Sequence, residues 1–326
     1  MENMPFENRI NINLISDTMD AVKSEIGKVV VGQHEAIELM LTAILADGHM
    51  LLEGVPGVAK TLTAKLIAKS IDVDFSRVQF TPDLMPSDVM GTNVFNPQKV
   101  SFEFKKGPIF SNLVLIDEIN RAPAKTQAAL FEVMEEKTIT VDGISYPLEP
   151  PFIVIATQNP VEHEGTYQLP EAQLDRFMFK IIIDYPSQEH EIEVLQRHQN
   201  NHNMHQLIHL VHKILDAAKL TELRSLVSQV NVENKLLHFI TQIVHQTRNN
   251  NGLLLGASPR ASIAILNAAK ALATLRGRDF VTPEDIIYVA TPALRHRISL
   301  SAEKEMDGTT TDDIIHDIIK GIEIPR

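Results

Sequence analysis

The sequence has no cysteine and no tryptophan among its 326 residues. Without cysteine there is no disulfide, no thiolate nucleophile and no thiolate zinc site. No apolar run approaches the roughly 18–20 residues that span a bilayer. Residues 1–10 lack the basic and apolar segments of a signal peptide. We therefore expect a cytoplasmic protein with no transmembrane segment, and not a secreted, disulfide-stapled one.

Basic residues are outnumbered. The chain has 30 Lys and Arg against 42 Asp and Glu, a net charge of −12 at pH 7. Such a surface does not favour phosphate backbones, so we expect no nucleic acid as the main partner. The composition, 44% apolar and 22% charged, is that of an ordinary globular chain. At roughly 100–200 residues per domain, its length allows two domains or three.

Short apolar segments and helical patterns alternate over the first two-thirds of the chain. The segments that resemble strands are residues 49–54, 77–80, 112–118, 151–160 and 177–185, and a helical pattern covers residues 124–136. This alternation predicts an α/β fold with a mostly parallel sheet covered by helices on both faces. Two hairpins interrupt it. They are expected at 92–107, around Asn96-Pro97, and at 137–148, around Asp142-Gly143.

Strand patterns end after Tyr185-Pro186. We expect an α/β domain at 1–186 and a smaller, all-helical domain at 187–326. Ser258-Pro259 and Thr282-Pro283 read as helix starts, with the hydroxyl residue as N-cap and proline at the first helical position. Asp285, three residues after Thr282, completes a capping box.

The segment GVPGVAKT follows a strand and opens a helix, which is typical of a phosphate-binding loop. Glycines let backbone N–H groups wrap a phosphate chain, and the helix contributes its positive N-terminus. Lys60 is expected to reach the β- and γ-phosphates, and Thr61 to place its hydroxyl on Mg²⁺. Ala59 stands where a glycine is usual, which is tolerable if its dihedrals are already helical. The predicted phosphate-binding residues are Gly54, Val55, Pro56, Gly57, Val58, Ala59, Lys60, Thr61 and Leu62.

Two carboxylates and an amide follow other predicted strands. Asp117 is expected to hold the Mg²⁺, and Glu118 to activate an attacking water. Asn159 is placed to orient that water, or it is simply a turn residue before Pro160. Open α/β sheets bind ligands at the carboxyl ends of their strands, so we expect these side chains to meet the phosphate loop.

Two arginines are candidates for neutralising charge on the transferred phosphoryl group, Arg176 before the last strand and Arg260 at a helix start in the second domain. The alternative for each is a surface ion pair, and the neighbouring Asp175 is the obvious partner for Arg176.

Taken together, several motifs resemble the AAA+ ATPases, specifically the MoxR group. They are GVPGVAKT (54–61), LIDEINR (115–121), ATQNP (156–160), LPEAQLDRF (169–177), GASPRA (256–261), GRDFVTPEDI (277–286) and LRHR (294–297). The resemblance runs from about Val30 to Leu300. It implies that Arg176 is an arginine finger offered to a neighbouring subunit. It also implies that Arg260 is a sensor-2 arginine and Asn159 a sensor-1 residue, with Val31 and Gly32 near the adenine.

The resemblance also implies how such a protein works. The cofactors are ATP and Mg²⁺, and the partners are other copies of the chain in a hexameric ring. A protein client is expected, with a possible further partner that carries a von Willebrand factor A domain. In the expected mechanism the helical domain at 187–326 is a lid, and ATP lies between it and the α/β domain, where Arg260 senses the γ-phosphate. Hydrolysis then shifts the lid and the hairpins, whose aromatic residues Phe95, Phe102, Phe104 and Tyr146 are candidates for gripping the client.

Other functions stay open at this point. The chain is a chaperone-like remodelling ATPase, the motor subunit of a chelatase-type insertion complex, a slowly hydrolysing regulatory scaffold or, least favoured, a nucleic-acid motor. Two features have no assigned role. One is a run of histidines at His198, His202, His205, His209 and His212, for which a solvated surface is favoured over a metal site. The other is the basic group Arg276, Arg278, Arg295 and Arg297, for which salt bridges are the default.

Overall fold

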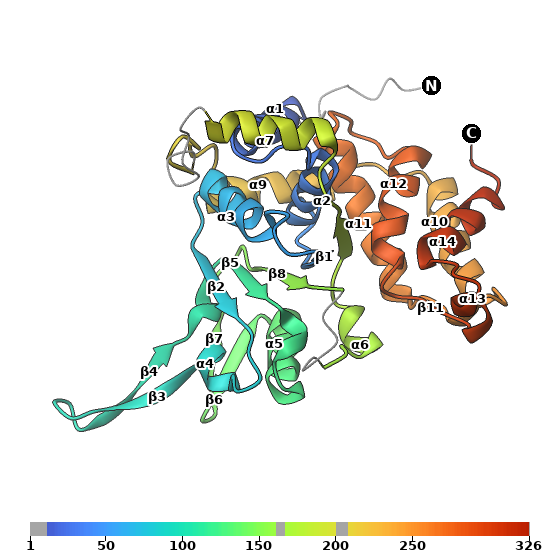
Figure 1. Cartoon of the computed structure of the whole chain (residues 1–326). Helices are drawn as coiled ribbons and strands as arrows, with labels where there is room; N and C mark the ends of the chain where they lie inside the picture. The colour runs from blue at the N-terminus through green and yellow to red at the C-terminus, as the bar shows by residue number, and fades with distance from the viewer. Residues whose placement is uncertain (1–11, 161–166, 200–207, 326) are drawn as a thin grey trace, which may run out of the picture.

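The computed structural model describes residues 12–160, 167–199 and 208–325. Its centre is a parallel sheet with the strand order β2-β5-β8-β1-β9 (Figure 1). These strands are β1 (Met50–Gly54), β2 (Phe75–Gln79), β5 (Leu113–Asp117), β8 (Ile153–Gln158) and β9 (Phe179–Ile183). The predicted parallel sheet and its five strands are confirmed.

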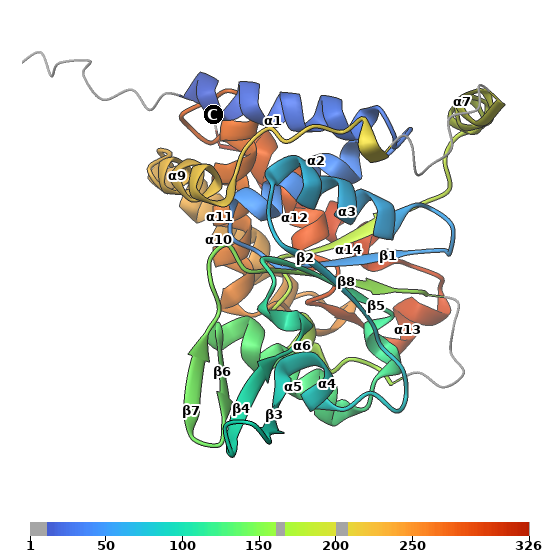
Figure 2. The same cartoon turned by 90° about the vertical axis from the view of Figure 1, so that its left-hand side faces the viewer.

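Helices cover both faces of this sheet, as Figure 2 shows. On one face lie α1 (Ile12–Gly27), α2 (His34–Leu45) and α3 (Lys60–Ile71); on the other lie α4 (Pro86–Met90) and α5 (Ala124–Glu136). Successive residues of a strand point to opposite faces. Leu115 accordingly packs in the core beneath the first set of helices, whereas Val114 and Ile116 pack in the core beneath the second.

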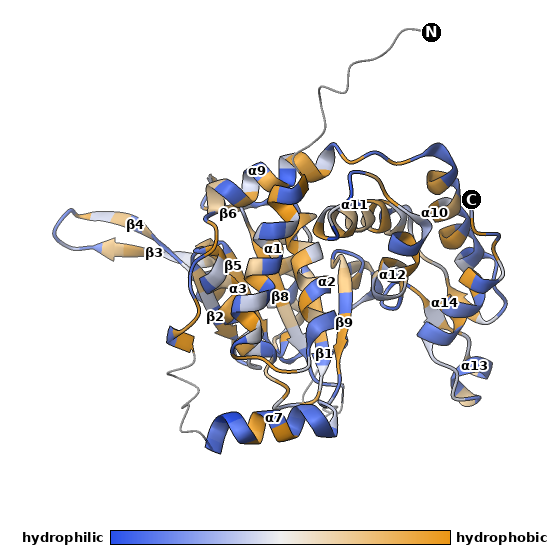
Figure 3. Ribbon diagram, turned by 90° about the horizontal axis from the view of Figure 1, so that it is seen from above, coloured by the Kyte–Doolittle hydropathy of each residue, from blue (hydrophilic) through white to orange (hydrophobic). Residues whose placement is uncertain are grey.

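A hairpin occupies each of the two expected segments. The longer one consists of β3 (Gly91–Asn96) and β4 (Ser101–Lys106), and the shorter one of β6 (Thr138–Val141) and β7 (Ile144–Pro147). Both project from the helical layer below the sheet, and β3–β4 extends well beyond the body (Figures 1 and 3). The hairpins touch: the rings of Phe104 and Tyr146 stack at 4.3 Å between centroids, and Asn93 donates to Asp142.

The chain after β9 is mainly helical. It contains α7 (Gln188–Gln199), α9 (Ala217–Ser228), α10 (Asn234–Arg248), α11 (Pro259–Leu275), α12 (Pro283–Leu294), α13 (Ala302–Met306) and α14 (Thr311–Lys320). Ser258 and Thr282 are the N-caps of α11 and α12, and the capping box with Asp285 is present. Two short strands, β10 (Leu253–Leu255) and β11 (Ser299–Leu300), pair among these helices, which the expectation of an all-helical part did not include.

This helical part packs beside the sheet, near the start of β9 (Figure 1). Helix α11 contacts α1 and α2, and α12 contacts β9. His296, just after α12, is hydrogen-bonded through Nε2 to the carbonyl of Phe177 at 2.9 Å. In contrast, α7 stands apart from the other helices (Figures 2 and 3). In the described ranges of the chain, no helix is long and apolar enough to cross a bilayer.

Candidate nucleotide-binding site

The predicted phosphate-binding segment, called the phosphate loop below, lies between β1 and α3 at the carboxyl edge of the sheet. Gly57 has φ +90° and open space around it, so it supplies the conformational freedom expected of the loop. Gly54 is needed for a different reason. A Cβ there would lie 2.4 Å from the carbonyl oxygen of Ile183, because β9 passes close by. Lys60 donates from Nζ to the carbonyl of Gly54, back across the loop.

Ala59 lies in the left-handed region, with φ 60° and ψ 21°, where helical dihedrals were expected. It immediately precedes α3, and the loop turns there so that the helix points its N-terminus into the loop. A methyl group in this conformation costs roughly 1–2 kcal/mol relative to a right-handed residue. The glycine usual at this position therefore has a conformational reason, and this chain carries alanine with strain.

Thr61 and Asp117, the predicted Mg²⁺ residues, lie together. Thr61 Oγ1 is 3.4 Å from Asp117 Oδ1, and Thr157 Oγ1 donates to the same oxygen at 3.2 Å. Hydroxyl and carboxylate oxygens are suitable ligands for Mg²⁺. Asp117 is 5% exposed and also pairs with Arg77 of β2, at 2.6 Å from Nε to Oδ2. Sequence reasoning missed Arg77, which is exposed and belongs to no motif.

Glu118 follows β5 with a left-handed backbone, φ 58°. Its backbone N–H donates to Thr157 Oγ1 at 3.1 Å. Its carboxylate accepts from Gln79 Nε2 at 2.7 Å and pairs with Arg121 Nε at 3.1 Å. The side chain that was predicted to activate water is thus held at the edge of the sheet by two neighbouring donors, neither of which was foreseen.

Asn159 comes directly after β8, the strand that lies between β5 and β1. This position puts it between the carboxylates that follow β5 and the phosphate loop that follows β1. The three predicted strand ends are therefore neighbours, as the parallel sheet requires.

A cavity of about 630 Å³ opens next to the phosphate loop. Its largely apolar lining includes Val31, which the family resemblance assigns to the surroundings of the adenine, and Gln33, whose Nε2 donates to the carbonyl of Val58 at 2.5 Å. Gly32 adopts φ +76°, and a Cβ there would collide with His190 at 2.5 Å from Nδ1. The segment at 29–33 and the phosphate loop thus form two walls of one cavity suited to a nucleoside base.

Helix α7 forms a third wall through Val194, Leu195 and His198, and Tyr185 and Pro186 continue that wall. None of the residues of α7 is buried. Arg197 ties the helix to the chain after α1, with NH1 2.8 Å from the carbonyl of Lys28. Sequence reasoning assigned this helix to the lid and missed its place at the cavity. Apolar residues in an otherwise polar helix after the last strand were the available signal.

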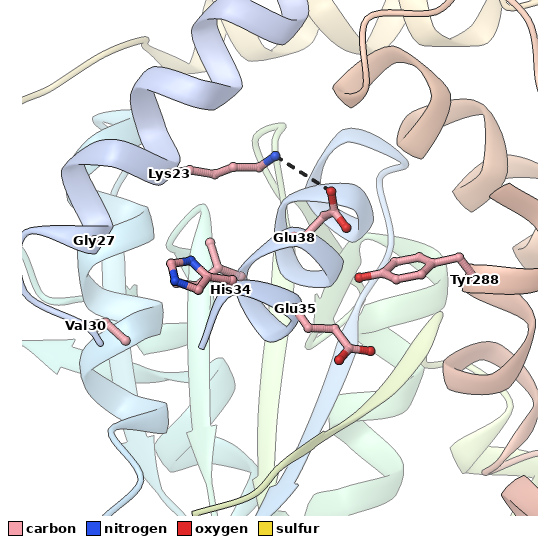
Figure 4. A pocket seen from close by; sticks show the side chains of 8 residues that line it. Lys23, Gly27, Val30, His34, Glu35, Glu38 and Tyr288 are labelled. Atoms are coloured by element: carbon pink, nitrogen blue, oxygen red, sulfur yellow. Dashed lines mark ion pairs between the residues drawn. The ribbon is translucent and has the colours of Figure 1, made fainter. Parts of the chain in front are cut away.

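A second cavity, of about 440 Å³, lies between α1, α2 and α12 (Figure 4). Glu38 faces it from α2, 3.8 Å from Lys23 Nζ and 3.1 Å from Arg276 NH2. Burial and the charge of Glu38 raise the pKa of Tyr288 above its ordinary value. Glu38 is thus paired with Lys23 and with Arg276, and the cavity marks the place where α12 meets the first two helices.

Arg176 and Arg260 lie together, away from the two cavities described above. Both contact Glu135 near the end of α5: Arg176 NH2 is 2.7 Å from Oε2, and Arg260 NH2 is 2.5 Å from Oε1. Each arginine thus makes an ion pair, which was the alternative reading for both, but the partner of Arg176 is Glu135 and not Asp175. Asp175 is held instead by Arg297 Nε at 2.7 Å and by Ser258 Oγ at 2.8 Å.

This arginine cluster is at the amino edge of the sheet. It shares a hollow of about 280 Å³ with Gly48 and His49, which precede β1, and with Met178, which precedes β9. The phosphate loop follows the other end of β1, and the five residues of that strand span roughly 16 Å. Arg260 is therefore not placed to sense a γ-phosphate on its own chain, contrary to the expected mechanism, because the lid meets the sheet at the opposite edge.

The remaining basic residues make structural contacts. Arg278 binds the fully buried Asp285 through two bonds of 2.6 Å, Arg295 pairs with Asp312 at 2.7 Å, and Arg276 lies over the ring of Tyr288 at 4.6 Å. The default expected for this group, salt bridges, is therefore what the structure contains.

The run of histidines does not form a continuous stripe in the part of the chain that the structure describes. His198 belongs to α7, which ends at Gln199, and His209 and His212 follow a gap. His202 and His205 lie outside the described residues. Within the described ranges there is no group of three or more His, Cys, Asp or Glu that could hold a metal.

Comparison with known proteins points to one family. Residues 49–179 match the "ATPase family associated with various cellular activities (AAA)", and residues 245–318 match the AAA lid domain. Protein YeaC of Bacillus subtilis is 46% identical over 92% of this chain and 92% of its own length. Chaperone MoxR1 of Mycobacterium tuberculosis is 41% identical over 95% of this chain and 83% of its own.

The fold has a close counterpart among solved structures. The crystal structure of a candidate ATPase from Cytophaga hutchinsonii aligns with a TM-score of 0.88 and 46% identity over 97% of both chains. A magnesium-chelatase subunit, ChlI of Glycine max, is a more distant relative, 27% identical over 71% of this chain and 52% of its own length.

Proposed function

Because this chain belongs to the MoxR group of AAA+ ATPases, we propose that it hydrolyses ATP with Mg²⁺ to remodel or mature a protein complex, at a site shared between neighbours in a ring. One observation supports a site that is shared between subunits: Arg176 and Arg260 lie together at the amino edge of the sheet, opposite the phosphate loop of their own chain. A site that is completed by the next subunit makes a head-to-tail contact, which closes into a ring when the rotation permits.

The carboxyl edge of the sheet would hold the nucleotide. The phosphate loop and Lys60 bind the phosphates, and the cavity beside Val31 takes the base. Thr61 and Asp117 would hold the Mg²⁺, which would supply positive charge that offsets the charge of the phosphates. Glu118 accepts the proton of the attacking water, and Asn159 orients that water.

The amino edge of the next subunit would supply the positive charge. Arg176 approaches the γ-phosphate as a finger, and Arg260 arrives beside it from the start of α11. Both are accessible from outside, with 27% and 51% of their side chains exposed. We therefore assign Arg260 to the neighbour's nucleotide rather than to its own.

The longer hairpin is our candidate for contact with a client. Phe95 and Phe102 pair across β3 and β4 with 49% and 71% of their surfaces exposed, so both are free to meet another protein. Phe104 and Tyr146 pack on each other and are better suited to joining the hairpins than to gripping a client. A partner with a von Willebrand factor A domain remains part of the proposal on the family resemblance alone.

The experiment that tests the shared site measures ATPase rate against protein concentration, with the mass from light scattering. Specific activity should rise as rings form. Glu118→Gln should bind ATP without turnover, and Lys60→Ala should lose both. Activity that is independent of concentration in a persistent monomer would contradict the proposal and leave a nucleotide-gated scaffold as the better function.

Mixed rings locate the two halves of the site. Arg176→Ala and Glu118→Gln subunits should each be inactive alone. Their mixture should regain activity wherever an intact Glu118 site faces an intact Arg176. If verified mixed rings stay inactive, the finger does not act in the neighbouring site.

A further inference from the structure

Glu135 is the point where the two arginines meet. Its carboxylate accepts Arg176 on one oxygen and Arg260 on the other, at 2.7 Å and 2.5 Å. The three residues come from separate parts of the fold: the end of α5, the segment before β9 and the first turn of α11. One carboxylate thus joins a residue of the α/β part to a residue of the helical part.

The two arginines depend on Glu135 to different degrees. Arg176 has a second anchor, since its NH1 donates to the carbonyl of Phe131, one turn earlier in α5. The side chain of Arg260 has Glu135 as its hydrogen-bond partner among the described residues. Removing the carboxylate would therefore release Arg260 more completely than Arg176.

The backbone next to Glu135 is itself held in place by a buried side chain. His49 is buried beneath this end of α5, and its Nε2 is hydrogen-bonded to the carbonyl of Met134 at 3.1 Å. The backbone next to Glu135 is therefore fixed to the start of β1, while the carboxylate remains 39% exposed at the surface. A rigid base with an accessible charge suits a residue that sets the position of other side chains.

We propose that Glu135 is a positioning residue for catalysis in the neighbouring subunit: it holds the guanidinium groups of Arg176 and Arg260 at a fixed separation before a γ-phosphate arrives. This inference rests on the shared site proposed above. Two adjacent cations repel each other, and a carboxylate between them offsets that repulsion. Charges fixed before the reaction stabilise a transition state without reorganising, so the pair would act as one preformed anion receptor.

The test compares Glu135→Ala with Glu136→Ala, the adjacent glutamate, which makes no ion pair with any residue that the structure describes. Glu135→Ala should lower kcat by about 10- to 100-fold, the size expected when a catalytic group is misplaced by about 1 Å. Binding of a fluorescent ADP analogue to each subunit's own phosphate loop should be unchanged. Glu136→Ala should leave both quantities as in the parent.

Mixed rings make the test specific. Glu135→Ala mixed with Glu118→Gln should regain activity, because the Glu118→Gln subunit presents an intact arginine pair. Glu135→Ala mixed with Arg176→Ala should not, because both subunits present a defective arginine pair. A residue needed only for folding would not separate in this way.

A double-mutant cycle adds an independent readout. Glu135→Ala in an Arg260→Ala background should cost less activity than Glu135→Ala in the parent, since Arg260 depends on Glu135 more than Arg176 does. Glu135→Gln, which keeps an accepting oxygen without the charge, should retain more activity than Glu135→Ala and serves if the alanine variant fails to fold.

Three results would overturn the inference: parental kcat in both Glu135 variants, additive losses with Arg260→Ala, or reduced nucleotide binding to the variant's own site. Failure of the shared site itself would look different. In that case Arg176→Ala would also fail to regain activity with Glu118→Gln.

Discussion

Arg77 Nε lies 2.6 Å from Asp117 Oδ2, across the adjacent strands β2 and β5. The carboxylate is almost completely buried, and the arginine reaches it from a position that is half exposed. Arg77 therefore places a positive charge beside the carboxylate that is proposed to hold Mg²⁺. A divalent cation at Asp117 has to share the carboxylate with this guanidinium or displace it.

We predict that Arg77→Met lets nucleotide bind at a lower Mg²⁺ concentration. At an effective dielectric constant near 20, two unit charges about 4 Å apart interact by about 4 kcal/mol, so even partial relief of the repulsion supports a shift of about tenfold. Titration of a fluorescent ADP analogue at several Mg²⁺ concentrations measures the effect. Arg77→Lys keeps the charge and should shift the Mg²⁺ requirement less. A higher Mg²⁺ requirement in Arg77→Met would show that the arginine assists the cation.

Stability should fall as the pH falls below about 6.5, the unfolded pKa of histidine. Burial lowers the pKa of His49 to about 4, and its Nδ1 accepts a hydrogen bond from the backbone of Val154 at 3.0 Å. Between pH 6.5 and pH 4 the unfolded chain therefore binds a proton at this histidine that the native protein does not bind. The free energy of unfolding decreases over that range. For His49 alone the loss by pH 5 is about 2 kcal/mol. Burial also lowers the pKa of His296, which acts in the same direction.

Urea unfolding at pH 7 and pH 5 checks this prediction. His49→Gln should be less stable at pH 7 but should lose less stability on acidification than the parent. His238→Gln, at an exposed position of α10, should follow the parent at both pH values. An equal pH dependence in all three proteins would mean that His49 is protonated in the native state.

Ala59→Gly should stabilise the protein by about 0.5 kcal/mol. Relief of the left-handed strain contributes about 1 kcal/mol, and the greater freedom of glycine in the unfolded chain offsets part of that gain. Ala68→Gly, the same change inside α3, should instead cost about 1 kcal/mol, because Ala68 is buried and helical. Thermal unfolding of both variants measures the difference in sign. Equal destabilisation would indicate that Ala59 is not strained.

The sequence predicted those parts of the fold whose signals are local. Strands such as Leu113–Asp117 are apolar throughout, and the loop from Gly54 to Thr61 carries its chemistry within a few residues. The shared edge of the sheet then followed from strand direction alone. For the same reason the contact of Thr61 with Asp117 was foreseeable, although the residues are far apart in the chain.

Contacts that depend on how distant elements pack were not foreseeable. Nothing near Glu135 in the sequence indicates that it meets Arg176 and Arg260, since these come from three separate elements. Arg260 was placed at its own nucleotide because a lid motif says nothing about the edge of the sheet at which the lid docks. The second reason for a glycine at position 54 was likewise not foreseeable, because the close approach of Ile183 belongs to a different strand.

The stacked pair of Phe104 and Tyr146 should couple the two hairpins mechanically. Stacking of this kind contributes about 1 kcal/mol beyond the area that it buries, so its loss should speed amide exchange in the partner hairpin about fivefold. We predict that Phe104→Ala raises hydrogen exchange in β6 and β7, although the substitution lies in β4. Phe102→Ala, on the exposed outer part of the same strand, should leave β6 and β7 protected. Unchanged exchange in Phe104→Ala would mean that the hairpins move independently, and force generated at the nucleotide would then reach a client through β3 and β4 alone.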